Sequence, residues 1–232
     1  MRSLDEIRAR TPKSEIFRRQ LLHALLATLL TYGALWLFRQ PSSRYLNLGP
    51  YVFFLAAIAI ALFHQILVAI VFRLQLHLDL MVRMFGKYAL IIWGIIFLPL
   101  LVLRPTLVLI AGLTVTKELL PIAPMYYLPV GAILLIPAIW GMHSVIKYFT
   151  IPRALGGDHF YDRYANMPMV REGIFKYSSN AMYTFVFIGF WAIAILTNSW
   201  NALVLAAFNH AYIWVHMYCT EDPDMRIIYA DD

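Results

Sequence analysis

Long apolar segments alternate with short polar ones along this chain. The length of each apolar segment is close to the roughly 20 residues that an α-helix needs to cross the hydrocarbon core of a bilayer. Continuous apolar runs with few charges are typical of helices in lipid rather than of amphipathic surface helices. The pattern predicts an all-α integral membrane protein with about six transmembrane helices, at residues 20–38, 50–72, 88–103, 125–149, 180–196 and 200–217.

The boundaries of the third helix depend on prolines. Pro99 is expected to kink it, and Arg104 with Pro105 is expected to end it. The apolar run that follows is too short to span a bilayer alone, so residues 106–124 are predicted to form an interfacial or re-entrant segment.

The last two apolar segments are separated only by Thr197-Asn198-Ser199, so they are expected to form an antiparallel hairpin. The basic residues concentrate in the leader 1–19 and in connectors 73–87 and 147–176. Lys and Arg are enriched on the cytoplasmic side of membrane proteins. Both termini are therefore predicted to be cytoplasmic, together with the polar segments at the two ends of the hairpin.

Composition supports a membrane protein and narrows its partners. The chain is 61% hydrophobic and only 14% charged, with a net charge of +6. This charge is attributed to cytoplasmic anchoring, because no basic stripe with interleaved aromatic residues indicates a nucleic-acid partner. The expected partners are the bilayer and a membrane lipid. The single Cys219 excludes an intramolecular disulfide.

Three regions are predicted from these patterns. Residues 1–19 form a basic cytoplasmic leader, and residues 20–124 hold the first three helices and the interfacial segment. Residues 125–232 form a core with the polar loop 150–179 and a C-terminal acidic motif.

No metal site is predicted. The seven histidines are scattered, and the chain has no Cys pair and no His-Glu-x-x-His motif. His210 and His216 are six residues apart, so they do not share a helical face well. His64, inside the second helix, is expected to make an interhelical hydrogen bond.

Polar residues also follow one face of the last helix. Asn209, Tyr212 and His216 are spaced by three and four residues, so they align toward the end that carries Glu221. They could be interhelical hydrogen-bonding partners or could line a pocket, and spacing alone leaves both open. Polar groups beside a bilayer indicate a functional site by default.

Three segments carry a resemblance to a known family. These are residues 156–164, then Asn180-Ala181-Met182-Tyr183, and finally Glu221-Asp222-Pro223. In this order around a short hairpin, they resemble the membrane phospholipid methyltransferases, which are phosphatidylethanolamine N-methyltransferases and the related isoprenylcysteine carboxyl methyltransferases. The resemblance covers about the last third of the chain. Ala181 stands where the family has Pro, and Asp222 where it has a second Glu.

The resemblance implies S-adenosylmethionine as the methyl donor, bound at the cytoplasmic end of the last helices, and a lipid acceptor that enters sideways from the bilayer. A carboxylate pair can accept charge-assisted hydrogen bonds from the ammonium group or ribose diol of this cofactor. An amine acceptor must be neutral to attack, so Asp158 or His159 is the expected catalytic base. The residues expected to bind the cofactor are Gly157, Asn180, Tyr183, Tyr212, His216, Glu221 and Asp222.

Three functions are compatible with these residues. The preferred one is methylation of a phospholipid amine. The second is carboxyl methylation of an isoprenylcysteine or another amphipathic small molecule. The third is a non-catalytic membrane protein that keeps the same fold. A transporter is disfavoured, because the charges sit at the helix ends and no internal repeat is present.

Overall fold

The computed structural model describes residues 3–39, 49–114 and 120–229, and within these ranges every regular element is helical. The prediction of an all-α membrane protein is confirmed. The longer helices are α2 (Gln20–Leu37), α3 (Pro50–Leu78), α5 (Ala89–Leu113), α6 (Tyr127–Ser144), α10 (Ile188–Leu196) and α11 (Trp200–His216).

Short helices and turns connect or extend them. The short α-helices are α1 (Leu4–Arg10), α4 (Leu80–Phe85), α7 (Ile151–Ala154), α8 (Gly157–Phe160), α9 (Asp162–Ala165) and α12 (Asp222–Ile228). Wider π turns lie at Val145–Phe149, Met182–Val186 and Met217–Glu221. Tight 3₁₀ turns lie at Lys13–Phe17, Gly86–Tyr88, Pro124–Tyr126 and Gly173–Lys176.

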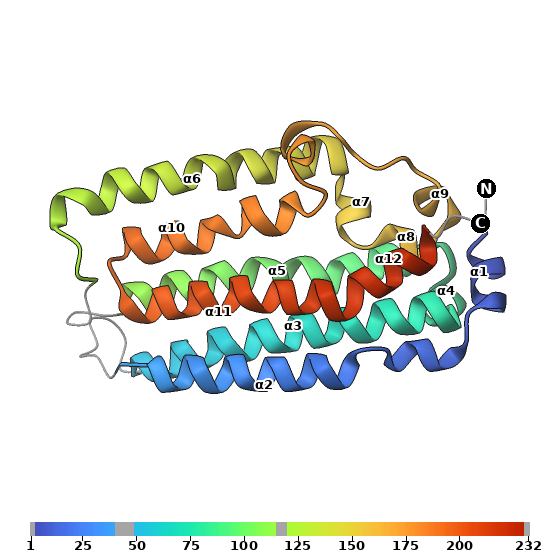
Figure 1. Ribbon diagram of the computed structural model, residues 1–232, viewed down its shortest axis with the longest axis horizontal. Helices are drawn as coiled ribbons and strands as arrows, with labels where there is room; N and C mark the ends of the chain where they lie inside the picture. The colour runs from blue at the N-terminus through green and yellow to red at the C-terminus, as the bar shows by residue number, and fades with distance from the viewer. Residues whose placement is uncertain (1–2, 40–48, 115–119, 230–232) are drawn as a thin grey trace.

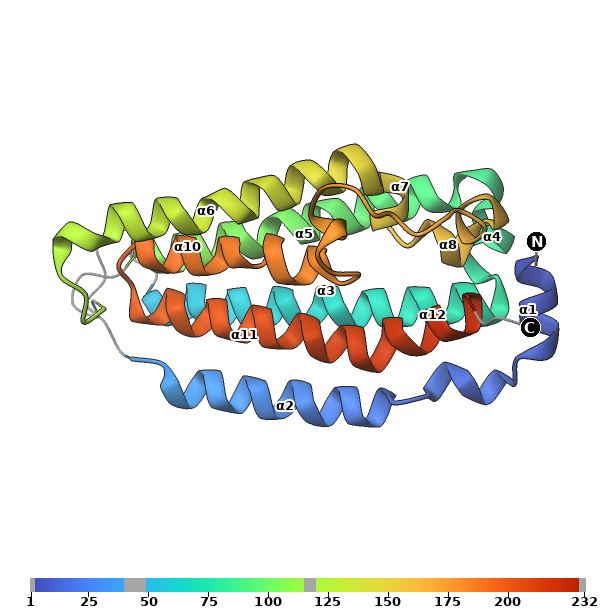
Figure 2. The ribbon, with the colours of Figure 1, turned by 45° about the horizontal axis from the view of Figure 1, so that its top comes forward.

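The long helices run back and forth along one axis, so both termini lie at the same end of the bundle (Figure 1). Helix α10 packs against α6 and α11, α3 packs against α5, and α2 packs against α11. Figure 2 shows α2 at the edge of the bundle and the loops around α7 and α8 at the end that carries α12. The polar segments at the two ends of the last hairpin therefore meet.

Among the described residues, four helical stretches are long and apolar enough to cross a membrane. These are Lys13–Leu37, Pro50–Leu78, Leu80–Leu113 and Tyr127–Phe149. The apolar stretch Met182–Leu196 and helix α11 are shorter. The predicted count of about six crossings is therefore not confirmed, although the order and positions of the apolar helices agree with the prediction.

The prediction that a helix ends at Arg104 and Pro105 was wrong. Helix α5 continues through both residues to Leu113, so residues 106–113 are helical rather than interfacial. Residues 115–119 of that segment lie outside the described residues. The charge of Arg104 does not stop the helix because its side chain is only 1% exposed and has partners. Its Nε donates to Asn209 Oδ1 at 3.0 Å, and its Nη1 lies 3.4 Å from His64 Nδ1.

These contacts show whether Asn209 is an interhelical hydrogen-bonding partner or lines a pocket, which the sequence left open. Asn209 and His64 do make interhelical hydrogen-bonding contacts, through Arg104, so Asn209 is a packing partner rather than a pocket residue.

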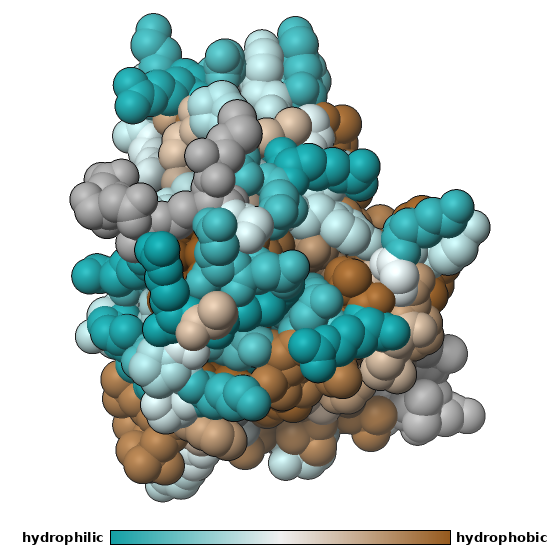
Figure 3. Space-filling model, turned by 90° about the vertical axis from the view of Figure 1, so that its right-hand side faces the viewer, coloured by the Kyte–Doolittle hydropathy of each residue, from teal (hydrophilic) through white to brown (hydrophobic). Residues whose placement is uncertain are grey.

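The end of the bundle that carries the termini is polar. Figure 3 views this end, where hydrophilic side chains cover the top and the middle of the view and hydrophobic ones gather mainly along the bottom. The residues predicted for the functional site lie in and beneath this end.

Candidate functional site

The loop that carries Asp158 and His159 is anchored by its backbone. Gly156 has a φ of +76°, and a side chain there would also collide with the ring of Phe72, so only glycine fits. The Trp93 indole donates to the Leu155 carbonyl at 3.1 Å. These contacts place the short helix α8 against α3 and α5.

Gly157 has a packing role in the same turn. A Cβ at this position would lie 2.7 Å from the Pro152 carbonyl oxygen and 2.8 Å from the Tyr164 ring. Gly157 therefore lets α7, α8 and α9 approach one another, and its predicted cofactor contact stays a prediction.

Both ring nitrogens of His159 are engaged. Nδ1 lies 3.0 Å from Asp158 Oδ1, and Nε2 lies 3.3 Å from Asp224 Oδ2. The ring also stacks on Phe72, with centroids 4.3 Å apart. Burial opposes a charge on His159, but the two carboxylates outweigh it and raise its pKa to about 10. In this arrangement His159 holds its proton at neutral pH, so its predicted role as a catalytic base does not fit.

Asp158 has two donors. Its Oδ1 lies next to His159 Nδ1, and its Oδ2 accepts a hydrogen bond from the Tyr229 hydroxyl at 3.2 Å. Burial would raise the pKa of Asp158, but the hydrogen bonds from His159 and Tyr229 and the charge of His159 keep it below its usual value. Asp158 is therefore an ionised carboxylate and a weak base.

Asp224 and Arg73 complete this network, and sequence analysis missed both. Their side chains are 0% and 2% exposed, and Arg73 Nη1 lies 2.9 Å from Asp224 Oδ1. Arg73 also donates to the carbonyls of Glu15 and Cys219, at 2.9 and 3.1 Å. We call Arg73, Asp158, His159, Asp224 and Tyr229 the end network. It ties the leader, α3, α8 and α12 together.

One signal could have revealed this network. Asp224 follows Glu221 by three residues, so it lies on the same side of a helical turn as the acidic motif. Arg73 gave no comparable signal, because it resembles any basic residue at the end of an apolar helix.

Glu221 lies between two predicted site residues. Its Oε2 accepts a hydrogen bond from the Tyr183 hydroxyl, and its Oε1 is 3.5 Å from His216 Nε2. Burial raises the pKa of Glu221 to about 7, although the Tyr183 hydrogen bond and the charge of His159 act in the opposite direction. The side chain is still 21% exposed. Glu221 can therefore gain or lose a proton near neutral pH.

Asn180 lies at the start of the helix that carries Tyr183. Its carbonyl accepts from the backbone nitrogens of Tyr183 and Thr184, at 3.1 and 3.2 Å. Its side chain is half-buried. The structure thus brings Tyr183, Glu221 and His216 together at the end of the bundle where α11 ends, and Asn180 lies one turn before Tyr183.

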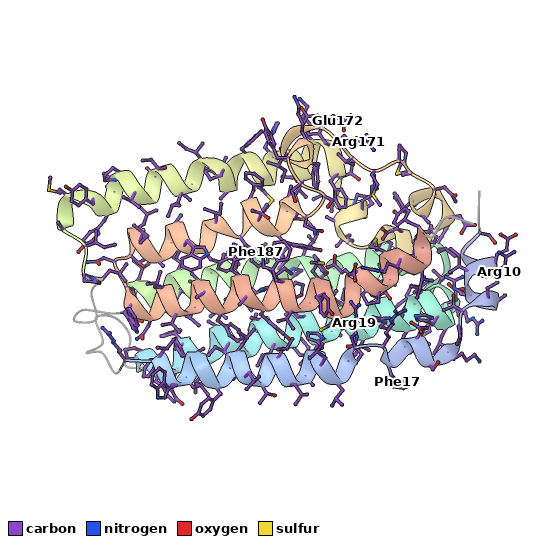
Figure 4. All side chains as sticks on the ribbon, in the orientation of Figure 1. Arg10, Phe17, Arg19, Arg171, Glu172 and Phe187 are labelled. Carbon is purple, nitrogen blue, oxygen red and sulfur yellow. The ribbon has the colours of Figure 1, made fainter. Side chains whose placement is uncertain are left out.

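Asp222 does not lie with Glu221. Its Oδ2 is 3.0 Å from Arg19 Nη1, and its Oδ1 accepts from Arg226 Nε at 3.0 Å. Figure 4 shows Arg19 at the N-terminal end of α2, beside the start of α12. Successive residues in a helical turn point about 100° apart, so adjacent carboxylates face different surroundings. The two acidic residues predicted as a pair are therefore separated.

Tyr212 and His216 belong to a third set of polar side chains. His23 of α2, which sequence analysis did not select, has its ring 5.6 Å from Tyr212 and 5.7 Å from His216. All three are buried. Tyr212 Oη, His23 Nε2 and both ring nitrogens of His216 make no hydrogen bond to the described residues. We call these residues the open group. Buried polar atoms are normally hydrogen-bonded, so this group offers sites for the polar atoms of a ligand.

The residues that the structure describes contain no group of three or more His, Cys, Asp or Glu that could hold a metal ion.

Comparison with known proteins finds similarity in the C-terminal part of the chain. Residues 126–232 match the family described as Phospholipid methyltransferase. The chain is 27% identical over 106 residues to a phosphatidylethanolamine N-methyltransferase of Clavispora lusitaniae, covering 44% of this chain and 12% of that protein. It is 28% identical over 76 residues to one of Komagataella phaffii, covering 33% of this chain and 8% of that protein.

A third relative agrees with these two. The phosphatidylethanolamine N-methyltransferase of Debaryomyces hansenii is 26% identical over 103 residues, which cover 43% of this chain and 11% of that protein. The matches span about a tenth of the length of these relatives. No solved structure matches the chain. The resemblance to the phospholipid methyltransferases is therefore confirmed over residues 126–232, the segment that contains every residue predicted for the site.

Proposed function

We propose that this protein transfers a methyl group from S-adenosylmethionine to the amine head group of a membrane phospholipid. The family match of residues 126–232 supports the reaction class. The observation that carries the proposal is the position of Glu221, between Tyr183 and His216 at the end of the last long helix. This position puts a partly exposed carboxylate where a polar cofactor and a lipid head group can meet.

The residues at this junction fit the cofactor. S-adenosylmethionine has an ammonium group and a ribose diol, for which a carboxylate is a suitable acceptor. Glu221 would accept from one of them, and Tyr183 and Asn180 would line the same side. The bound cofactor would supply an electrophilic methyl group on its sulfonium. Asp222 would instead fix α12 through Arg19 and Arg226.

The acceptor amine must lose a proton, and His216 is the residue we propose to receive it. His159 has no free nitrogen, and Asp158 is a weak base. His216 has ring nitrogens without a hydrogen bond among the described residues. It would take the proton at Nε2, the atom 3.5 Å from Glu221. Burial and the nearby basic side chains hold the pKa of His216 well below its usual value, so the imidazolium would depend on the Glu221 carboxylate for its stabilisation.

We also propose that this reaction takes place on the cytoplasmic side. The leader 1–19 and the connectors 73–87 and 147–176 hold most of the basic residues. Both termini lie at the end of the bundle that carries the candidate site (Figure 1). Basic segments are retained on the cytoplasmic side, which supports cytoplasmic termini.

Binding of S-adenosylmethionine to the purified full chain, measured by calorimetry, tests the cofactor half of the proposal. We expect saturable binding that weakens at least about tenfold in Glu221→Gln, a loss of about 1.4 kcal/mol. Since the ionised carboxylate is the better acceptor, binding should tighten as pH rises through about 7, the pKa of Glu221, and the variant should lack this trend. A folded wild-type protein that shows no saturable binding at millimolar cofactor would overturn the proposal.

Transfer of labelled methyl groups into vesicles of phosphatidylethanolamine tests the second half. We expect His216→Gln to lower kcat strongly while leaving cofactor binding nearly intact. Methyl transfer to an isoprenylcysteine acceptor is measured in a parallel assay. Methylation of that acceptor alone would replace the proposed substrate class.

A further inference from the structure

A groove of about 610 Å³ runs between α2 and α3, two helices that lie outside the segment that matches the family. Its walls include Ala24, Ala27 and Thr28 of α2 and Leu62, Ile66 and Ala69 of α3. Tyr212 of α11 also lines it. The volume lies within the usual range for small-molecule sites.

Residues just after and just before α2 contact α3 at the two ends of the groove. At one end the ring of Phe38 packs against Tyr51 and Phe54, with centroids 5.0 and 4.9 Å apart. At the other end Arg73 donates to the carbonyls of Glu15 and Arg18. Between these ends the lining residues on α2 run from Gln20 to Leu35, about 22 Å at 1.5 Å per residue.

The groove is polar at one end and apolar along the rest. Gln20, His23 and Tyr212 line it near the end of the bundle that carries the termini. Farther along, the hydroxyls of Thr28 and Thr31 donate to carbonyls of their own helix, at 2.8 Å each. These two threonines therefore need no partner in the groove.

Two buried polar atoms beside the groove make no hydrogen bond to the described residues. They are Tyr212 Oη and His23 Nε2, on side chains that are 0% and 4% exposed as whole residues. The His23 ring also lies 5.7 Å from the ring of His216. The polar end of the groove thus contains two members of the open group, and the third member, His216, lies 3.5 Å from Glu221.

The groove opens toward lipid. The neighbouring outer face of α2 exposes Leu21, Leu25, Leu29 and Trp36, with exposed fractions of 55% to 76%. One leaflet contributes about 15 Å of a hydrocarbon core of roughly 30 Å. A groove of about 22 Å therefore spans the depth of one leaflet and extends into its head-group region.

We propose that this groove binds one acyl chain of the acceptor phospholipid and directs its head group to His23, Tyr212 and His216. The polar end matches the head group, and the apolar length matches the chain. The identity of this lipid as the methyl acceptor rests on the proposed function. The helices outside the family-matched segment then determine which lipid reaches the site.

Photo-crosslinking tests the groove independently of methyl transfer. The full chain is reconstituted in phosphatidylcholine vesicles containing phosphatidylethanolamine with a photoreactive group midway along one acyl chain. We expect labels on the groove walls of α2 and α3. Ala24→Trp should reduce this labelling about tenfold by filling the groove, since Ala24 lines it and is exposed.

The matched control is Leu29→Trp, which adds a similar indole to α2 at a residue that is 65% exposed and does not line the groove. It should leave the labelling unchanged, and both variants should keep the wild-type melting temperature. Labels spread evenly over the lipid-facing helices, or insensitive to Ala24→Trp, would overturn the inference.

An activity measurement then connects the groove to the acceptor. Ala24→Trp should raise KM for a long-chain phosphatidylethanolamine about tenfold and leave turnover of a short-chain analogue and cofactor binding unchanged. Equal KM values in wild type and variant would show that the bound lipid is not the acceptor. If the wild type binds no cofactor, the proposed function fails, and crosslinking still decides whether the groove holds an acyl chain.

Discussion

The two buried polar clusters at the same end of the bundle differ in how their hydrogen bonds are satisfied. In the end network, both nitrogens of His159 have carboxylate partners and Asp224 forms an ion pair with Arg73, although Arg73 Nε and Asp224 Oδ1 make no hydrogen bond to the described residues. In the open group, polar atoms of His23, Tyr212 and His216 have no hydrogen-bond partner among the described residues. The sequence ranked residues of both clusters as site candidates on equal terms.

This difference indicates that the end network and the open group have separate roles, one structural and one in binding. A buried charge is tolerated only when it is paired, so a network of paired charges holds elements together. Unpartnered buried polar atoms do not stabilise the fold, and they can bind an incoming polar group. Glu221 lies between the two clusters, since it contacts His216 and its pKa responds to the charge of His159.

Disrupting the end network should have the largest effect on stability. Asp224→Asn leaves the Arg73 guanidinium buried without its anionic partner, and breaking such a pair costs about 3–5 kcal/mol. We expect a large drop in the melting temperature in detergent. Arg73→Met combined with Asp224→Leu should recover part of this loss. An unchanged melting temperature in Asp224→Asn would show that the network is not a scaffold.

The end network should also make stability depend on pH. The pKa of His159 is raised to about 10 by its two carboxylates. A raised pKa in the folded state gives stability that is complete below the ordinary value of about 6.5 and is lost as pH rises through about 10. The melting temperature should therefore fall between neutral pH and about pH 10. The same scan on His159→Gln should show a smaller dependence, and identical curves would contradict the assignment of the charge.

The smallest effect is expected at Asp222. Its carboxylate pairs with Arg19 and Arg226 and is 26% exposed, and exposed ion pairs contribute about 0–1 kcal/mol. Asp222→Asn should therefore change stability by less than about 1 kcal/mol and leave binding of S-adenosylmethionine nearly unchanged. A tenfold loss of binding would instead place Asp222 with Glu221 in the cofactor site.

Arg104 and Asp222 show where inference from sequence failed. Arg104 was expected to end a helix, because a charge next to proline in an apolar run usually marks a boundary. Its partners Asn209 and His64 come from other helices and make the charge tolerable inside the bundle. Asp222 was expected to act with Glu221 because the two residues are adjacent in the sequence. The helical turn instead directs the Asp222 side chain away from Glu221, toward Arg19, which is distant in the chain.

The sequence by itself determined the all-helical membrane architecture, the order of the apolar helices and the resemblance of the C-terminal segment. These features depend on local composition, on segment length and on short motifs. Only the tertiary structure decided that His159 is saturated, that Glu221 lies between Tyr183 and His216, and that α2 and α3 enclose a groove. Each of these depends on contacts between residues far apart in the chain. Hydrophobic periodicity specifies which face of a helix is buried, but not which polar partner it meets there.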